Sequence, residues 1–357
     1  MKRSNRCISS VLAGAAAGAL ALGFASASSA QETVVDVLTA NEGTCTLFST
    51  HAAREMGIYE DAGISVNLLA SETTVPYVAF LSTGDAELVM LDSAQVYQMA
   101  NSGEQGSVIY EVMQKAPEGI IVMADGPVKT LQDLDGATVG LASDRDQITT
   151  IVTLDSVGMS IDQVKTVVVG DQGPLLASAL TKGDIQAFAG GSQDFSNIAA
   201  AGVPILNITP AAVSQNVGNS FAIWDDRAEE IREIVTHYLR GHSMANLASM
   251  IDPKAVASMC RAAVPEEWEN LDTGWEIANN SFFDLNLRRT LLFGELQPDV
   301  WAAVQVPYVK LGELPNTIET GEFLDDSFIA GANDFTTAEV KDYINAWKGA
   351  NEGALLP

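Results

Sequence analysis

The sequence changes from a helical pattern to a strand pattern within Gly57-Ile58-Tyr59-Glu60-Asp61-Ala62-Gly63-Ile64-Ser65-Val66-Asn67-Leu68. A helical arrangement of apolar residues starts near Phe48, and Gly57 and Gly63 end it. Residues 64–68 then alternate between apolar and polar side chains, as a half-buried strand does. The β-branched run at 34–38 comes before the helix, so the order is strand, helix, strand.

The same alternation continues on the C-terminal side of this stretch. Helical patterns at 75–82 and 93–101 alternate with strand patterns at 87–91 and 108–112. A second block begins near residue 125, with strands at 137–141, 164–169, 185–188 and 203–208 and helices at 146–156, 173–182 and 192–200. From residue 225 long helical patterns dominate, at 227–251, 253–263, 266–282, 298–311 and 336–347. We therefore predict an α/β protein with two α/β lobes and a helical tail.

The first thirty residues predict a cleaved secretory signal peptide. They contain Lys2, Arg3 and Arg6 and no acidic residue, then an apolar run at 11–24, then small residues at 25–30. The apolar run is short for a membrane span of about 20 residues. These thirty residues contain no Arg-Arg pair, so we expect a Sec-type signal, cleavage after Ala30, a periplasmic location and no stable membrane insertion afterwards.

The chain is strongly acidic. Its 357 residues hold 19 Lys and Arg against 46 Asp and Glu, a formal charge of −27. Loss of the three basic residues of the predicted signal lowers that charge to −30. Such a charge repels phosphate backbones, so we expect no nucleic-acid partner. The hydrophobic content of 47% is sufficient for a folded core.

Two cysteines, Cys45 and Cys260, remain after the signal. An oxidising compartment allows a bridge between them. Nothing in the sequence shows that their Cα atoms approach closely enough, so we expect two unpaired buried thiols.

Motifs of common enzymes are absent. The chain has no G-x-x-x-x-G-K-[ST] phosphate loop, no G-x-G-x-x-G after the first strand, no H-E-x-x-H, no paired C-x-x-C and no G-x-S-x-G. His237 and His242 lie five residues apart on a helical pattern, which is a poor spacing for a metal. We expect no enzymatic activity, no cofactor and no metal.

Four segments resemble, in order, motifs of the SsuA/THI5-like (NMT1) family of periplasmic solute-binding proteins. Residues 57–68 resemble its G-[FY]-F-x-x-x-G-L-x-V-x-L segment. The other three are Leu81-Ser82-Thr83-Gly84-Asp85-Ala86-Glu87-Leu88, Leu131-Gln132-Asp133-Leu134-Asp135-Gly136-Ala137-Thr138-Val139-Gly140 and Gly183-Asp184-Ile185-Gln186-Ala187. Glu87 and Gln186 depart from the family's usual Asp, and Asp135 and Ala137 from its frequent Lys, at turn and surface positions.

The resemblance implies a two-lobed class II periplasmic binding fold with a helical C-terminal tail. Lobe one would comprise residues 31–124 and 225–357, and lobe two residues 125–224, with the chain crossing near 123–125 and 221–225. The implied function is that of an extracytoplasmic solute-binding protein. It would capture a small polar organic ligand between its lobes and deliver it to the membrane permease of an ABC transporter. We expect it to act as a monomer.

In open α/β sheets, ligands bind beyond the carboxyl ends of the strands, where helix N-termini point. Loops at such places supply the candidate ligand-binding residues Asn41, Thr46, Phe48, Glu72, Asp92, Ser93, Gln114, Ser143, Asp144, Arg145, Ser192, Gln193, Asp194 and Trp224. Asp92 and Asp194 could instead only cap helices. Arg145 could pair with a neighbouring aspartate or clamp an anion. Several acids facing the cleft would favour an amine or a nitrogen heterocycle.

Two other functions stay open. Some THI5-like members make the thiamine pyrimidine and consume their own histidine, but that position falls on Leu47 here. Their cysteine run is also absent, and Asn216-Val217-Gly218-Asn219 stands in its place. A sensory module for a membrane receptor would share the features of a transport protein. The ligand could be a nitrogen-containing compound, a sulfonate or a molecule like a thiamine precursor.

Overall fold

The computed structural model describes residues 33–39, 44–70, 77–144, 146–170, 173–286 and 288–357. The predicted signal peptide therefore lies outside the described residues. Residues 32–357 form one compact unit. Within the described part of the chain, no helix combines the length and the apolarity that crossing a membrane requires.

The first of two five-stranded sheets has the strand order β2-β1-β3-β10-β4. Its strands are β1 (Thr33–Thr39), β2 (Ile64–Ala70), β3 (Leu88–Leu91), β4 (Gly106–Glu111) and β10 (Ser220–Trp224). Strand β1 runs parallel to β2 and β3, whereas β10 is antiparallel to β3 and β4.

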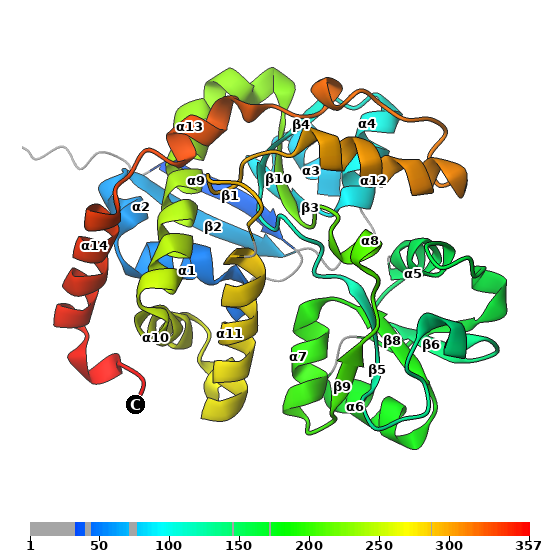
Figure 1. Cartoon of the computed structure of the whole chain (residues 1–357). Coiled ribbons are helices and arrows are strands. Elements are labelled where there is room, and N and C mark those ends of the chain that lie inside the picture. The colour runs from blue at the N-terminus through cyan, green and yellow to red at the C-terminus, as the bar shows by residue number, and fades with distance from the viewer. Residues whose placement is uncertain (1–32, 40–43, 71–76, 145, 171–172, 287) are drawn as a thin grey trace, which may run out of the picture. The chain divides into compact units, whose positions relative to one another are not determined.

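The second sheet repeats this arrangement with the order β7-β6-β8-β5-β9. Its strands are β5 (Gly119–Met123), β6 (Thr138–Leu141), β7 (Lys165–Val168), β8 (Ala187–Gly190) and β9 (Ile205–Asn207). Strand β6 is parallel to β7 and β8, and β5 is antiparallel to β8 and β9. Figure 1 shows the two sheets as separate groups of strands.

Helices cover both faces of each sheet. Those of the first sheet and the tail are α1 (Phe48–Glu55), α2 (Ile58–Asp61), α3 (Tyr77–Thr83), α4 (Ser93–Ser102), α9 (Ala228–Ile251), α10 (Pro253–Ala263), α11 (Leu271–Asn286), α12 (Pro298–Lys310), α13 (Ile329–Ala332) and α14 (Thr337–Ala350). The second block holds α5 (Asp146–Asp155), α6 (Gly173–Lys182), α7 (Ser192–Ala200) and α8 (Ala211–Ser214).

The predicted α/β order is confirmed, with one refinement at the stretch that begins at Gly57. Gly57 has a φ of 77°, a left-handed conformation that glycine adopts without a steric penalty. The helical pattern therefore breaks into α1 and α2. Gly63, with a φ of 73°, then turns the chain into β2.

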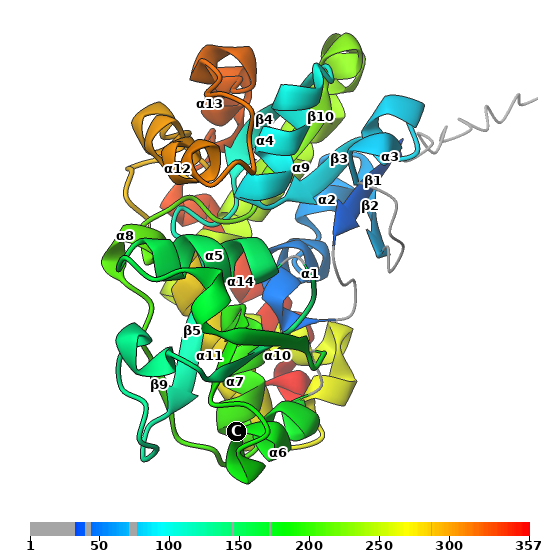
Figure 2. The same ribbon diagram turned by 90° about the vertical axis from the view of Figure 1, so that its right-hand side faces the viewer.

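Alternating side chains divide the core of each lobe into two layers. In β1, Val35 and Val37 pack against α1, α9 and α10, whereas Leu38 points to the layer with α3, α4 and α12. In β5, Ile120 and Val122 face α5, and Ile121 faces α6 and α7. Figure 2 shows α5 on one side of the second sheet with α6 and α7 on the other.

The chain crosses between the sheets earlier than we expected. Strands β5 and β10, which we had placed at or next to the crossings, are each integral to a sheet. They are apolar and almost fully buried, and they run antiparallel to their neighbours. The crossings therefore lie between Glu111 and Gly119 and between Asn207 and Ser220.

The expectation of two unpaired thiols is wrong. Cys45 and Cys260 form a disulfide, with Cα atoms 5.8 Å apart. The two residues are 215 positions apart in sequence, and they meet because α10 packs against α1. The indole Nε1 of Trp268 contacts Cys45 Sγ at 3.3 Å, so the bridge lies in a buried part of the core.

Candidate functional site

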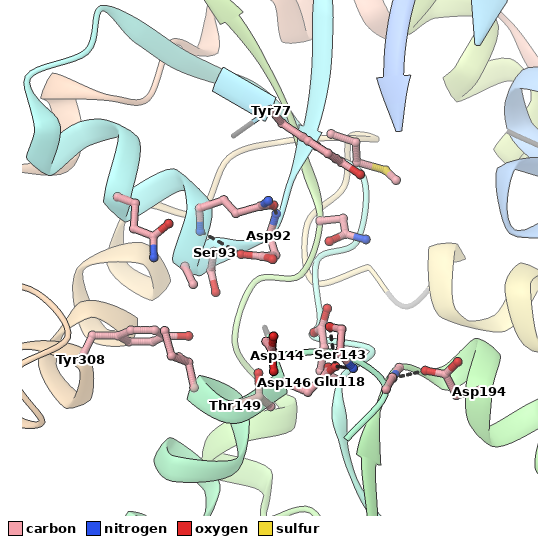
Figure 3. A pocket seen from close by; sticks show the side chains of 18 residues that line it. Tyr77, Asp92, Ser93, Glu118, Ser143, Asp144, Asp146, Thr149, Asp194 and Tyr308 are labelled. Carbon is pink, nitrogen blue, oxygen red and sulfur yellow. Dashed lines mark hydrogen bonds between the residues drawn. The ribbon is translucent and has the colours of Figure 1, made fainter. Parts of the chain in front are cut away.

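A cavity of about 590 Å³ lies between the two sheets (Figure 3). Strand direction explains which residues reach it. Strands β3, β6 and β8 end at the cavity, whereas the antiparallel β5 and β10 begin there. The lining residues are Tyr77, Met90, Asp92, Ser93, Ala94, Gln95, Gln98, Glu118, Ala142, Ser143, Asp144, Asp146, Ile148, Thr149, Gly191, Asp194, Asn219 and Tyr308.

Asp92 follows β3 and begins α4. Its Oδ1 accepts a hydrogen bond of 2.8 Å from the Gln95 backbone N–H, and the Gln95 side chain accepts one of 3.0 Å from the Asp92 N–H. This reciprocal pair is a capping box. Asp92 also lines the cavity, so capping and a place in the cavity go together at this residue.

Two further helices have their N-termini at the cavity, and each contacts a carboxylate of the chain itself. Asp146, the first residue of α5, accepts hydrogen bonds from the Ser143 N–H at 2.7 Å and from the Ser143 hydroxyl at 2.9 Å. Asp194 in α7 accepts one of 2.9 Å from the Gly191 N–H. Because helix N-termini favour negative charge, an aspartate side chain suits each of these positions.

Tyr308 enters the cavity from α12 (Figure 3). Burial raises the pKa of its hydroxyl to about 12; a hydrogen bond with Ser93 opposes this, and the negative charges of Asp92, Glu118 and Glu313 add to it. Tyr77, at the start of α3, supplies a second aromatic side chain. The cavity thus has two tyrosines near several carboxylates.

The cavity is acidic. Five of its described lining residues are Asp or Glu, and none of the described ones is Lys, Arg or His. Among the described residues, no group of three His, Cys, Asp or Glu side chains is arranged to hold a metal ion.

A family model described as NMT1/THI5 like matches residues 48–255. The chain belongs to the NMT1/THI5-like family. No curated protein sequence gives a significant match to it.

Solved structures share the fold of this NMT1/THI5-like chain at low sequence identity. A protein of Bordetella bronchiseptica RB50 is 15% identical, with a TM-score of 0.65 over 85% of this chain and 98% of that one. The periplasmic aliphatic sulphonate-binding protein SsuA of Escherichia coli is 14% identical, with a TM-score of 0.62 over 81% and 96%. A DszB variant in complex with biphenyl-2-sulfinic acid is 13% identical, with a TM-score of 0.59 over 84% and 99%. The two-lobed periplasmic binding fold is therefore that of the family.

The cavity of this NMT1/THI5-like chain contains five of the predicted site residues: Asp92, Ser93, Ser143, Asp144 and Asp194. A small neighbouring pocket, lined also by Asn280 and Ser281 of α11, contains three others: Thr46, Ser192 and Gln193. Asn41, Glu72 and Arg145 lie outside the described residues.

Three predicted residues lie away from the cavity. Phe48 is fully buried, with its ring centroid 4.6 Å from that of Phe282. The Gln114 side chain donates hydrogen bonds to Thr290 Oγ1 at 2.7 Å and to the Glu295 carbonyl at 2.8 Å. Trp224 packs against the core layer beneath α12. Packing and loop anchoring account for all three, and a role in binding stays only a prediction for them.

Several lining residues were missed by reasoning from the sequence. Glu118 and Asn219 lie in the crossing segments, which we had placed elsewhere. Tyr308 comes from a tail helix far along the chain, and no local motif marks it. Only the packing of α12 on the first sheet brings it to Ser93.

Proposed function

We propose that this chain is an extracytoplasmic solute-binding protein that captures a small polar organic molecule between its lobes. The observation that carries the proposal is the cavity, which has the size of a small-molecule site and joins the strand ends of both sheets. Its polar lining can orient a ligand, and its tyrosines can pack against an apolar part of one. The Cys45–Cys260 bridge is in keeping with an oxidising compartment such as the periplasm.

Closure of the lobes would exclude water from the ligand. The two crossing segments run side by side: the Met113 N–H donates to the Asn219 carbonyl, the Gly218 N–H to that of Met113, and the Ala116 N–H to that of Asn216. Such a pair of connecting segments can bend as a hinge while the lobes move as rigid bodies. The closed form would then present its surface to a permease, which would transport the ligand.

Binding rather than catalysis fits the lining best. The described lining residues include no cysteine and no histidine, the side chain that most often serves as a general base. DszB is an enzyme with this fold, so the fold alone does not separate the two functions.

Thermal unfolding of residues 31–357 with a broad panel of small polar compounds tests the proposal. A ligand at a hundred times its dissociation constant stabilises the native state by about 2.7 kcal/mol, which raises the unfolding midpoint. We expect Ala94→Trp, which fills the cavity from α4, to abolish the response. Ala303→Trp on the exposed face of α12 is the matched control and keeps it. A panel without any stabilising compound, or an unchanged response in Ala94→Trp, would contradict the proposal.

Delivery to a permease needs a cellular measurement. Deleting the gene for this chain is expected to abolish uptake of the labelled ligand, and returning the gene restores it. Normal uptake together with a lost transcriptional response to the ligand would instead identify a sensory module.

A further inference from the structure

We propose that the cavity selects an organic cation, a protonated amine or a cationic nitrogen heterocycle, and rejects sulfonates and other anions. This inference rests on the proposed function and specifies the chemical class of its ligand. It starts from the cavity itself, which both lobes line and which is large enough for a molecule with one ring.

The first step is the charge of the lining. Asp92 comes from lobe one, Glu118 from a crossing segment, and Asp144, Asp146 and Asp194 from lobe two. A ligand between the lobes therefore has carboxylates on both sides. Figure 3 shows Asp92 on one side of the cavity and Glu118, Asp144 and Asp146 on the other.

The second step concerns the positive charge that could offset these acids. The internal segments outside the described residues, 40–43, 71–76, 145, 171–172 and 287, contain one basic residue, Arg145. They also contain the acidic residues Glu42, Glu72 and Asp171. One guanidinium does not neutralise five carboxylates, so the cavity keeps a negative potential even if Arg145 contributes its full charge.

The third step concerns the groups that an anion would use. Helix N-termini are the usual binding places for anions, because their N–H groups are free and their dipole is positive. Here Asp92 accepts from the Gln95 N–H of α4, Asp194 from the Gly191 N–H that precedes α7, and Asp146 from the Ser143 N–H that precedes α5. Internal carboxylates thus already occupy donors that a sulfonate would need.

The capping carboxylates still contribute negative charge to the cavity. Hydrogen bonds from backbone N–H groups do not remove the charge of an ionised carboxylate, which attracts a cation in the same cavity. Asp144 is exposed, and none of the hydrogen bonds of the described residues engages its side chain. Besides burial, the negative charges of Asp92 and Glu118 help to raise the pKa of the Tyr308 hydroxyl, which lines the same cavity.

The tyrosines add selectivity for a cation with an apolar or flat part. Tyr308 and Tyr77 are 7% and 8% exposed, so their rings are held in place by packing. A cation near the face of a tyrosine ring is attracted by the ring's quadrupole, whereas an anion is repelled.

Matched compounds test the inference directly. Each carbon skeleton in the panel is supplied as ammonium, alcohol and sulfonate, for example benzylammonium, benzyl alcohol and phenylmethanesulfonate. Thermal shift ranks them, and calorimetry measures affinity for the hits at low and at high salt. We expect hits among the ammonium compounds, with affinity that falls as salt rises.

Variants assign the selectivity to the cavity. We expect Asp144→Asn and Glu118→Gln each to lower the affinity for the ammonium ligand about twofold to fivefold, because each substitution removes one partly solvated negative charge. Asp162→Asn, at an exposed site of lobe two, is the matched control and leaves affinity unchanged.

The outcomes separate this inference from the proposed function. A sulfonate or alcohol that binds more tightly than its ammonium analogue overturns the inference but leaves a solute-binding protein. Equal affinity in Asp144→Asn, Glu118→Gln and the parent also overturns it. A panel without any ligand, charged or neutral, overturns the proposed function and the inference together.

Discussion

At the scale of single residues, Glu111 is a buried carboxyl group next to the tail of the protein. It is 1% exposed at the end of β4, and its oxygens accept hydrogen bonds from the Gln297 N–H at 2.7 Å, from the Trp301 indole at 3.0 Å and from the Gln297 side chain. Burial raises its pKa to about 7; these donors and the charge of Arg289 oppose that shift.

The raised pKa predicts a pH-dependent stability. A carboxyl that titrates near 7 when folded and near 4.5 when unfolded stabilises the native state below pH 4.5, and that contribution is lost as pH rises through 7. We expect the unfolding free energy of the parent, minus that of Glu111→Gln, to increase by up to about 3 kcal/mol between pH 8 and pH 5. Denaturant titrations across that range measure it.

The comparison with Glu111→Gln is needed because two buried histidines have the opposite effect on the pH dependence of the unfolding free energy. Burial lowers the pKa of His51 to about 4 and that of His242 to about 3, so both favour the unfolded state as pH falls below 6.5. Their effect is common to both proteins and cancels in the difference. A constant difference between pH 5 and pH 8 would contradict the assignment of this titration to Glu111.

At the scale of elements, one side chain at the N-terminus of α4 has a capping role in the structure and a proposed role in ligand binding. Asp92 is the N-cap of this helix and also lines the cavity. The two roles can be separated, because asparagine caps a helix about as well as aspartate but carries no charge.

We expect Asp92→Ala to lower the unfolding free energy by about 1 kcal/mol, whereas Asp92→Asn changes it little. Both variants are expected to weaken binding of the ammonium ligand, since both remove the charge. Chemical denaturation and calorimetry on the same preparations measure the two effects. Full affinity in Asp92→Asn would show that Asp92 serves only as a cap.

Helix α12 connects the first sheet, the cavity and α5. Its N-terminus is held by Glu111 of the first sheet, Tyr308 reaches the cavity, and Lys310 at its end bonds the Asp155 carboxylate of α5 at 2.7 Å. The helix therefore contacts both lobes. Apolar residues of α5, among them Val152, join the same core layer as Tyr308.

At the scale of the whole molecule, the crossing segments approach each other closely at Gly218. A Cβ atom there would lie 2.8 Å from Pro117 Cδ, 2.9 Å from the Lys115 carbonyl oxygen and 3.0 Å from Met113 Cβ. Two of these contacts are with atoms that cannot rotate away, so any side chain would push the segments apart.

We expect Gly218→Ala to lower the unfolding free energy by about 1–3 kcal/mol, because the added methyl group would push the two crossing segments apart. The same displacement is expected to lower the affinity for the ligand. Gly321→Ala is the matched control, since a Cβ atom at Gly321 meets no atom within 4 Å. Denaturation and solution scattering with and without ligand measure both effects. An unfolding free energy of Gly218→Ala equal to that of the parent would show that the crossing segments can accommodate a methyl group at this position.

The sequence by itself determined the local elements and their order. Gly57 and Gly63 mark the ends of α1 and α2, because glycine adopts a positive φ without a steric penalty. Alternating and helical apolar patterns reflect which face of an element is buried, so β1, β2, α4 and α7 were found near their true bounds. Cavity-lining residues directly after predicted strands, such as Asp92 and Ser143, could be anticipated for the same reason.

Only the tertiary structure decided which distant segments meet. The Cys45–Cys260 bridge, the membership of β5 and β10 in their sheets and the place of Tyr308 in the cavity all join residues far apart in sequence. The sequence of a short apolar run such as Gly119–Met123 does not indicate which sheet it joins, because the strands with which it pairs depend on the packing of the whole chain. The acidity of the cavity follows similarly: the sequence contains the acids, but the fold brings five of them around one cavity.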